Sequence, residues 1–508
     1  MQLAPLSVDK TLLKKISSRI ALRWRVLPIE QTSDGRIRIL SPDSNNSETL
    51  ENCRSLFNAD VLMIECSVEE FEKHIHESLG LGAAAVDELR DTHTLEEVDA
   101  PVAAGGEVAM VRFVNDLIRR AQNERATDIH IEPYEDELAV RFRIDGLLHP
   151  INIPASLARF QHVLSSRVKV MSQMNIAEKR LPQDGRFRFR AGSDDLDIRV
   201  SIIPTIHGES IDLRLLPRNR VVLGLEDLGM NKDYMGQIER IIGKPNGILL
   251  VTGPTGHGKT TTLYACLSRI NTPEKKIVTI EDPVEYRLRG INQIQTHSKI
   301  GLTFAHGLRS VLRQDPDVIM VGEIRDMETA EIAIRSSLTG HFVFSTLHTN
   351  DALGAITRLI DMGMEPYLVA SSLSAVLSQR LIRLICKECH SVTPACPPRR
   401  AEAGVQAPSN DGGAFLGGLD SRPRSPRRPS GNDCISCRGT GYRGRTGIFE
   451  LFTLNDELRD LILNRAPASL LREKALATGF RNLYQDGRIK IEAGLTSDIE
   501  VRRVAESI

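Results

Sequence analysis

A glycine-rich loop carries the clearest chemistry in the sequence. Residues 253–260 read Gly-Pro-Thr-Gly-His-Gly-Lys-Thr and fit the pattern G-x-x-x-x-G-K-[ST]. The apolar segment ILLVT precedes the loop and TTLYACLSRI follows it, so we expect a strand before it and a helix after it. Backbone amides and a helix N-terminus in that arrangement bind phosphate oxygens. We therefore predict a nucleotide-binding site made by Gly253, Pro254, Thr255, Gly256, His257, Gly258, Lys259, Thr260 and Thr261.

Three side chains of this loop have separate expected roles. Lys259 would reach the β and γ phosphates of ATP, and the Thr260 hydroxyl would bind Mg²⁺. We expect His257 to be a solvent-facing residue that only has to avoid the nucleotide. The alternatives for His257 are pH sensing and contact with phosphate.

Acidic residues follow two other predicted strands. Glu281, Asp282 and Glu285 come after KIVTI, and Glu323 comes after DVIMVG. A carboxylate at a strand end can orient water toward the γ-phosphate or hold Mg²⁺ through water. We predict that Glu323 orients the water, whereas Gly322, in place of the usual aspartate, argues against direct metal ligation from this strand. The first three acids are assigned to the nucleotide site, with capping or ion pairing as the alternative.

A third predicted strand, HFVFSTLH, ends in a polar cluster. His348 at its end could contact the γ-phosphate and report its presence. The alternative is a histidine at the edge of the core.

Eight cysteines need an explanation, since four of them form two C-x-x-C pairs. Cys386 with Cys389 and Cys434 with Cys437 are separated by 44 residues and suit a tetrahedral structural Zn²⁺. Redox chemistry and an Fe–S cluster are the alternatives. Cys396 is expected to be a spare thiol. The remaining cysteines are expected to be small core residues: Cys53, Cys66 and Cys266.

Composition narrows the class of protein. The 508 residues carry 65 Lys+Arg and 66 Asp+Glu, so the net charge of -1 argues against a surface devoted to nucleic acid or anionic lipid. Aromatic residues make up 4%, too few for extensive base stacking. No apolar run approaches the ~18 residues of a membrane span, and the N-terminus lacks a secretory signal. We expect a cytoplasmic protein of several domains.

Short apolar strands alternating with helices must position these residues. The segments GILLVTG, KIVTIED, DVIMVGE and HFVFSTLH favour a parallel sheet covered by helices. In such sheets, ligands bind at the carboxyl ends of the strands. Upstream, residues 108–216 mix helices with alternating strands that are rich in arginine. There the alternation places Arg141 and Arg143 on the face opposite Phe142 and Ile144.

These motifs together resemble the secretion ATPases of the type II (GspE) and type IV pilus families. LRQDPDVIMVGEIRD is close to the signature of that superfamily, IEDPVEY resembles its Asp box, and GHFVFSTLHTND resembles its His box. RLPQDGR and the segment from DIHIEP to RFRIDG resemble the domain before the motor in GspE proteins. The resemblance covers roughly residues 108–508, and the region before 108 matches only in position.

The resemblance implies a RecA-like motor that works as a homo-hexamer, with Glu323 as the catalytic glutamate. It also implies that Arg199 and Arg214 reach the nucleotide, where arginine stabilises charge on the transferring phosphoryl group. It strengthens the zinc assignment, although the insertion between the cysteine pairs is longer than usual. His257 stands where the family usually has a small residue. Weaker candidates for structural or intersubunit ion pairs are Arg309, Arg313, Arg325 and Arg358.

The implied fold is an α/β chain whose RecA-like P-loop motor follows a mixed α/β domain and a small N-terminal domain. We expect an N-terminal partner-binding domain at 1–90 with a linker to 107, and an α/β domain at 108–216. The ATPase core would span 226–385. A tetracysteine zinc module with a flexible loop at 391–433 would span 386–437, and a helical region 438–508.

The implied function is a cytoplasmic ATPase at the inner face of the inner membrane. It would couple ATP hydrolysis to pseudopilus assembly and to protein export across the outer membrane by type II secretion. Residues 1–90 would bind inner-membrane platform proteins, which supply the membrane association. A type IV pilus assembly ATPase is the alternative. A nucleic-acid translocase is disfavoured by the neutral charge, and a non-hydrolysing scaffold by the intact Lys259, Thr260 and Glu323.

Overall fold

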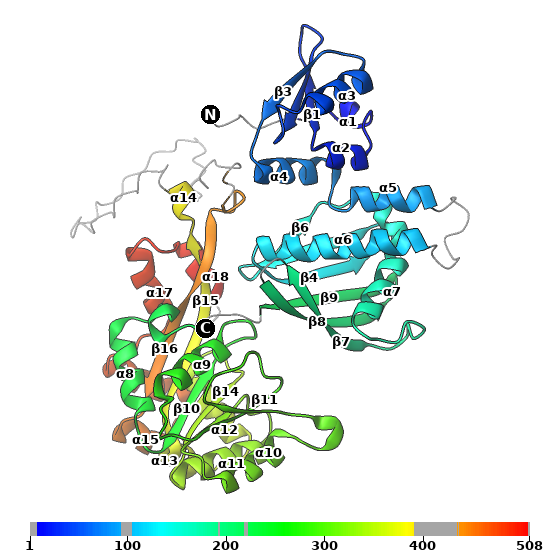
Figure 1. Ribbon diagram of the computed structural model, residues 1–508. Coiled ribbons are helices and arrows are strands. Elements are labelled where there is room, and N and C mark those ends of the chain that lie inside the picture. Colours follow the sequence, from blue (N-terminus) through cyan, green and yellow to red (C-terminus); the bar gives the residue numbers. More distant parts are fainter. Residues whose placement is uncertain are drawn as a thin grey trace, which may run out of the picture. The chain divides into compact units, whose positions relative to one another are not determined.

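The structure is a computed structural model, and it describes residues 8–92, 104–191, 194–217, 222–390, 434 and 436–505 (Figure 1). The chain divides into two compact units, Met1–Val221 and Val222–Ile508. Both units mix helices with sheets, as the sequence predicts. None of the described helices combines the length and the apolar character needed to cross a bilayer.

The first part of unit 1 is a three-stranded sheet with helices. The sheet has the order β1-β2-β3, with β1 antiparallel and β3 parallel to β2. Its apolar core includes Cys53, which is fully buried, whereas Cys66 is only partly buried and packs at the rim. The elements are α1 (Lys10–Leu13), α2 (Ser18–Trp24), β1 (Leu27–Gln31), β2 (Ile37–Ser41), α3 (Ser47–Phe57), β3 (Val61–Glu65) and α4 (Val68–Leu79).

The predicted linker is partly helical. Helix α5 (Ala83–Thr92) runs into it, and α6 (Ala104–Asn123) begins inside it. Residues 93–103 lie outside the described chain. Alanine, leucine and glutamate in these segments are good helix formers, which the acidic, small-residue composition obscured.

The second part of unit 1 is a six-stranded antiparallel sheet in the order β6-β5-β4-β9-β8-β7. Helices α6 and α7 contribute to the core with alternate strand residues such as Phe142 and Ile198. Arg141 and Arg143 lie on the other face of β5, as the alternation predicts. The elements are β4 (Ala126–Pro133), β5 (Leu138–Ile144), β6 (Leu147–Ile151), a 3₁₀ turn (Ala155–Phe160), α7 (Gln161–Met171), β7 (Gln183–Ala191), β8 (Asp194–Thr205) and β9 (Gly208–Pro217).

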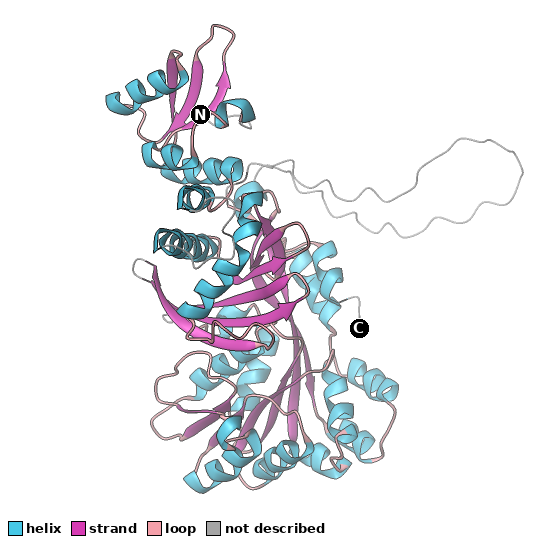
Figure 2. Cartoon of the chain, turned by 90° about the vertical axis from the view of Figure 1, so that its right-hand side faces the viewer, coloured by secondary structure: helices cyan, strands magenta, loops and turns pink. Residues whose placement is uncertain are grey.

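Unit 2 is built on a seven-stranded sheet in the order β12-β11-β13-β14-β10-β15-β16, with helices on both faces (Figure 2). Alternate residues of β10 enter the two cores: Ile248 and Leu250 one, Leu249 and Val251 the other. Burial of both faces explains the continuous apolar strands. The strands are β10 (Gly247–Thr252), β11 (Ile277–Glu281), β12 (Asn292–Gln295), β13 (Val318–Val321), β14 (Phe342–Leu347), β15 (Leu373–Ile385) and β16 (Tyr442–Thr453).

Strands β15 and β16 were absent from the expected sheet, and the region 438–508 therefore starts with a strand. They pair with each other antiparallel, and β15 pairs parallel with β10. Both contain buried polar residues, among them Gln379, Arg380 and Glu450, which mask the apolar pattern of a buried strand.

Two helices of unit 2 pack on one face of the sheet, and most of the others pack on the opposite face. Helices α8 and α9 share one apolar core with the sheet, and α10 to α13, α15 and α16 share the other. The helices are α8 (Lys232–Ile242), α9 (Lys259–Ile270), α10 (Phe304–Val311), α11 (Met327–Leu338), α12 (Ala352–Asp361), α13 (Pro366–Ser372), α14 (Lys387–His390), α15 (Asp456–Leu463), α16 (Ala468–Ala477), α17 (Leu483–Glu492) and α18 (Asp498–Ala505). Short 3₁₀ turns cover Leu225–Leu228, Ser298–Ile300 and Leu312–Gln314.

Candidate active site and cysteine cluster

The glycine-rich loop connects β10 to α9, as the sequence predicts. Gly256 and Gly258 adopt φ of 80° and 82°, a backbone region that favours glycine. Gly253 has φ of 138°, and a Cβ there would lie 2.5 Å from the Gln379 carbonyl oxygen. Glycine is therefore required at position 253 both by the backbone conformation and by the close approach of β15.

Lys259 opens helix α9 and folds back on its own loop. Its Nζ donates to the carbonyl oxygens of Gly253 at 2.7 Å and Pro254 at 3.1 Å. Burial lowers the pKa of Lys259 to about 8, with Glu323 raising it and Arg380 lowering it. The ammonium group therefore lies within electrostatic reach of Glu323, which comes from a different strand.

His257 does not face solvent, contrary to our expectation. It is partly buried, and its Nδ1 accepts a hydrogen bond from the Leu381 amide at 2.9 Å. The Gln379 Nε2 donates to the His257 carbonyl oxygen at 2.7 Å. The expectation failed because β15, which binds the ring, was not recognised as a strand beside the loop.

Glu323 and His348 meet at the carboxyl ends of β13 and β14. The Nε2 of His348 lies 3.4 Å from Oε2 of Glu323, and Arg325 pairs with the other carboxylate oxygen. The two strand ends are tied together beyond the ladder, since the Ile324 amide donates to the Thr346 carbonyl oxygen at 3.0 Å. An acid and a histidine are thus held side by side at the sheet edge where ligands of parallel sheets bind.

Gly322 fits the end of β13 closely against β11. Its amide donates to the Ile280 carbonyl oxygen at 2.7 Å, and a Cβ would lie 3.2 Å from that same oxygen. Any side chain at position 322 would have to displace the neighbouring strand by a few tenths of an ångström. The absence of an aspartate here has a packing reason, and Glu323 is left as the acid of this strand end.

Glu281 enters a buried hydrogen-bond network. Its side chain accepts from Thr279 Oγ1 at 2.6 Å, from the Tyr264 hydroxyl, and from Gln293 Nε2 at 3.1 Å. The residue is 3% exposed, and burial raises the pKa of its carboxyl group. Because its oxygens are engaged between β11, β12 and α9, the geometry favours the structural role over contact with nucleotide.

Asp282 and Glu285 differ from Glu281 in being exposed on the loop after β11. The charge of Asp282 helps to raise the pKa of Arg325, behind the larger effect of the Glu323 hydrogen bond. Asp282 is therefore near the Glu323 cluster, and the assignment of these two acids to the nucleotide stays a prediction.

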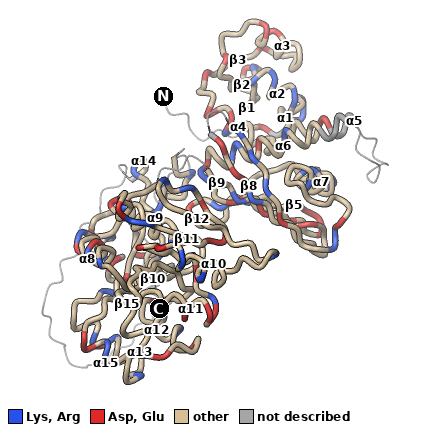
Figure 3. The backbone as a smooth tube through the Cα atoms, turned by 60° about the horizontal axis from the view of Figure 1, so that its bottom comes forward, with Lys and Arg blue, Asp and Glu red and all other residues tan. Residues whose placement is uncertain are grey.

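Arg199 and Arg214 belong to unit 1, on strands β8 and β9. They are cross-strand partners in the register. Arg214 Nε donates to Asp128 Oδ1 at 2.8 Å. Each of these strands carries a single basic residue, whereas the neighbouring strand β7 carries Arg186, Arg188 and Arg190 (Lys and Arg are blue in Figure 3). The approach of Arg199 and Arg214 to a nucleotide stays a prediction.

The weaker arginine candidates lie on the surface of unit 2. Arg309 Nη2 lies 2.5 Å from Glu328 Oε1, and Arg325 pairs with Glu323. Arg313 donates to the Arg309 carbonyl oxygen at 3.0 Å, and Arg358 is exposed on α12. Exposed pairs of this kind contribute little to stability.

Sequence reasoning missed Gln379 and Arg380 of β15. Gln379 is 2% exposed and accepts from Thr262 Oγ1 at 2.8 Å while donating to the loop. Arg380 is 5% exposed and donates to the Asn350 carbonyl oxygen at 2.8 Å, just after His348. The available signal was a Gln-Arg pair within a largely apolar run, SAVLSQRLIRLI.

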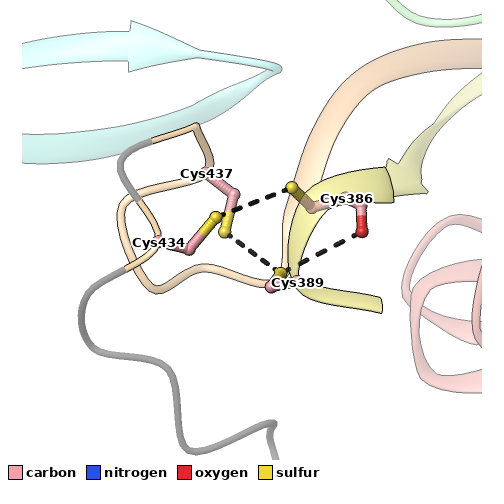
Figure 4. Close-up of side chains that lie close together, drawn as sticks. All are labelled: Cys386, Cys389, Cys434 and Cys437. Atoms are coloured by element: carbon pink, nitrogen blue, oxygen red, sulfur yellow. Dashed lines mark hydrogen bonds between the residues drawn. The ribbon is translucent and has the colours of Figure 1, made fainter. Parts of the chain in front are cut away.

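The four paired cysteines converge (Figure 4). Cys386 Sγ lies 3.9 Å from Cys434 Sγ, and Cys389 Sγ lies 3.6 Å from Cys437 Sγ. All four sulfurs lie within 4.8 Å of one another, an arrangement that can hold a metal ion. Cys396 falls outside the described residues, and Cys266 is buried in the core as expected.

Strands β15 and β16 bring the two cysteine pairs together. Ile385 at the end of β15 is the register partner of Tyr442 at the start of β16. The Cys386 amide donates to the Gly441 carbonyl oxygen at 2.9 Å, which extends this pairing into the cluster. Arg438 and Gly439 have φ of 53° and 74°, so the chain turns tightly just after Cys437.

Comparison with known proteins gives the same assignment as the motifs. The family model described as Type II/IV secretion system protein matches residues 103–503. The MshEN domain model matches residues 1–85. The family model therefore covers the described strands and helices that carry the loop, Glu323, His348 and the cysteines.

Individual relatives extend over nearly the whole chain. The Type II secretion system protein E of Xanthomonas campestris is 42% identical over 97% of this chain and 85% of its own length. The Type II secretion system ATPase E of Vibrio cholerae is 40% identical over 96% of this chain and 95% of its own length. The Type II secretion system protein E of Klebsiella pneumoniae is 48% identical over 83% of this chain and 79% of its own length.

Two solved structures share the fold at low identity. The Legionella pneumophila ATPase DotB has a TM-score of 0.55 at 20% identity, covering 78% of this chain and 96% of its own. The pilus retraction motor PilT with bound ADP has a TM-score of 0.50 at 24% identity, covering 77% and 96%. The resemblance stated from the motifs is confirmed by the sequence relatives, and the fold class by these structures. The chain is a member of the Type II/IV secretion system protein family.

Proposed function

We propose that this protein is the ATPase of a type II secretion system, coupling ATP hydrolysis to pseudopilus assembly and protein export. The observation that carries the proposal is the pair formed by Glu323 and His348, held at the sheet edge within electrostatic reach of Lys259. The names of the relatives supply the secretion system.

In this proposal, the residues of the candidate site have different roles in phosphoryl transfer. Loop amides and Lys259 hold the phosphates, and Thr260 at the start of α9 would hold Mg²⁺, which neutralises charge on the phosphates. Glu323 orients the attacking water, and His348 contacts the γ-phosphate from the neighbouring strand. Arg199 and Arg214 supply positive charge to the transferring group.

We infer that the cysteine cluster holds Zn²⁺. A regular tetrahedron with Zn–S bonds of ~2.3 Å has sulfurs ~3.8 Å apart, and the Cys389–Cys437 and Cys386–Cys434 sulfur distances of 3.6 and 3.9 Å match that spacing. Four thiolates leave no open position for water, so the ion would be structural. It would hold the end of β15 and the start of β16 together.

Replacement of Cys389 by serine should remove the zinc. A serine hydroxyl is a poor substitute for a thiolate ligand, and the three remaining sulfurs leave the tetrahedron open. We expect zinc per chain, measured by inductively coupled plasma mass spectrometry, to fall from about one to well below one half, with a lower melting temperature. Cys66→Ser, a thiol outside the cluster, is the matched control and should keep its metal. Unchanged zinc in Cys389→Ser would contradict the assignment.

The assembly and location follow the same proposal. The protein acts as a homo-hexamer in the cytoplasm, at the inner face of the inner membrane. Residues 1–90, which include the MshEN match, bind the inner-membrane platform proteins. The domain divisions at 90, 108–216, 226–385 and 386–437 remain part of this proposal.

A deletion in the source bacterium tests the function. We expect exported enzymes to accumulate in the periplasm and surface pili to be unchanged, with secretion restored by the wild-type gene. Loss of pili with normal secretion would instead support a pilus assembly motor. DNA-stimulated, strongly salt-dependent hydrolysis by the purified protein would support a nucleic-acid translocase.

A further inference from the structure

We propose that His257 is a positioning residue for ATP binding, which holds the glycine-rich loop on β15 by accepting the Leu381 amide at its Nδ1. This role goes beyond the ATPase function proposed above and depends on it only in that the loop binds ATP. The contact lies within unit 2, between two segments that are far apart in the sequence.

Strand β15 is longer than its parallel neighbour β10. The ladder between β10 and β15 ends at Thr252 and Ser378, where β10 gives way to the loop. Strand β15 continues to Ile385, so the Leu381 amide has no residue of β10 to bond. The imidazole of His257 takes the place of the missing strand carbonyl, at 2.9 Å. Without an acceptor, this partly buried amide would lose a hydrogen bond that water replaces only in part.

Three further features hold the loop at the same place. Gln379 Nε2 donates to the His257 carbonyl oxygen at 2.7 Å, and Gln379 Oε1 accepts from Thr262 of α9 at 2.8 Å. Gly253 approaches the Gln379 carbonyl so closely that a Cβ would clash. Strand β15 therefore fixes both the backbone and the side chain of His257. Its contacts with the loop extend from Gly253, the first glycine, to Thr262 in the first turn of α9.

The protonation state of His257 suits this role. An Nδ1 that accepts an amide must carry a lone pair, so the ring proton is on Nε2. Burial, and after it the positive charges of Arg380, Arg503, Lys259 and Arg445, together lower the pKa of His257 to about 4. The imidazole is therefore neutral at physiological pH, and the hydrogen bond persists.

The hydrogen bond bears on affinity rather than on the chemical step. Residue 257 lies between Gly256 and Gly258. Both glycines have positive φ, and neither has a side chain that could hold the backbone in place. Loss of the acceptor frees this part of the loop, and ATP must then order it again on binding. Glu323 and His348 lie on other strands, and the substitution leaves them in place.

Leucine and asparagine form a matched pair of variants at this position. Both branch at Cγ, but only asparagine offers an oxygen near the place of Nδ1. With the full-length protein and a fluorescent ATP analogue plus Mg²⁺, we expect H257L to weaken Kd about tenfold. We expect its KM to rise about equally and its kcat to stay within about twofold. H257N should restore Kd to within about threefold of wild type.

Three results would overturn the inference: wild-type affinity in H257L, equal weakening in H257N and H257L, or a loss of kcat without loss of affinity. If H257L does not fold, the comparison of H257A with H257N tests the same acceptor. Failure of the wild-type protein to bind ATP would refute the proposed function instead, so the two failures are distinguishable.

Discussion

Lys259→Ala will abolish ATP turnover by this protein, with kcat/KM lowered by at least ~100-fold. The lysine opens α9 at the end of the glycine-rich loop, and we propose that its ammonium group binds the β and γ phosphates. Removing it takes away positive charge where negative charge develops during phosphoryl transfer. Phosphate release and binding of a fluorescent ATP analogue, measured on the assembled protein, check the prediction.

A surface lysine provides the control for this substitution. Lys244 is exposed between α8 and β10, and Lys244→Ala should hydrolyse ATP at the wild-type rate. Wild-type kcat/KM in Lys259→Ala would contradict the assignment of the loop.

The pH dependence of the wild-type protein gives a second test of Lys259. Burial lowers the pKa of its ammonium group to about 8, so the group loses its proton as the pH rises through that value. The positive charge of Lys259 is therefore mostly present at pH 7 and mostly lost at pH 9. We expect kcat/KM for ATP, which reports the free protein, to fall across this range. In the ATP complex the phosphates favour the charged form, so kcat should fall less.

Glu323→Gln will separate binding from hydrolysis. Glutamine keeps the size of the side chain but removes the carboxylate that we propose orients water, so we expect kcat to fall by about 10²–10⁴-fold. At pH 7 the Kd for ATP should change by less than about fivefold, since the glycine-rich loop is built from other residues. Single-turnover phosphate release and equilibrium binding on the same preparation measure the two quantities.

Glu331→Gln is the matched control for this variant. Glu331 is on α11 and pairs with Arg335 at the surface, so its loss should leave kcat unchanged. Normal turnover in Glu323→Gln would refute the role of Glu323, and a parallel loss of ATP binding would show that the acid mainly stabilises the loop.

The acids at the ends of β11 and β13 show which site residues a strand pattern can predict and which it cannot. Both Glu281 and Glu323 follow buried strands, and the sequence assigns both to the nucleotide site. In the structure, Glu281 bonds to Tyr264 and Gln293, whereas Glu323 lies beside His348. The difference depends on what packs against each strand end, which residues distant in sequence decide.

The glycine-rich loop could be predicted well because its determinants are contiguous. The end of a strand, three glycines with positive φ and the first turn of a helix all lie within a few residues of one another. His257 was misjudged within that same motif, because the direction of its ring depends on the Leu381 amide of β15. Polar residues such as Gln379 and Arg380 had hidden that strand.

The cysteines mark the division between sequence and tertiary structure most clearly. The sequence alone identified these four cysteines as candidate metal ligands, since two C-x-x-C pairs are local patterns of thiols. Only the tertiary structure decided that the pairs meet, because the antiparallel register of β15 and β16 places Ile385 opposite Tyr442. The same strand β15 holds the glycine-rich loop through Gln379 and Leu381. Local backbone conformation can be read from neighbouring residues, whereas strand register is set by packing between segments far apart in the chain.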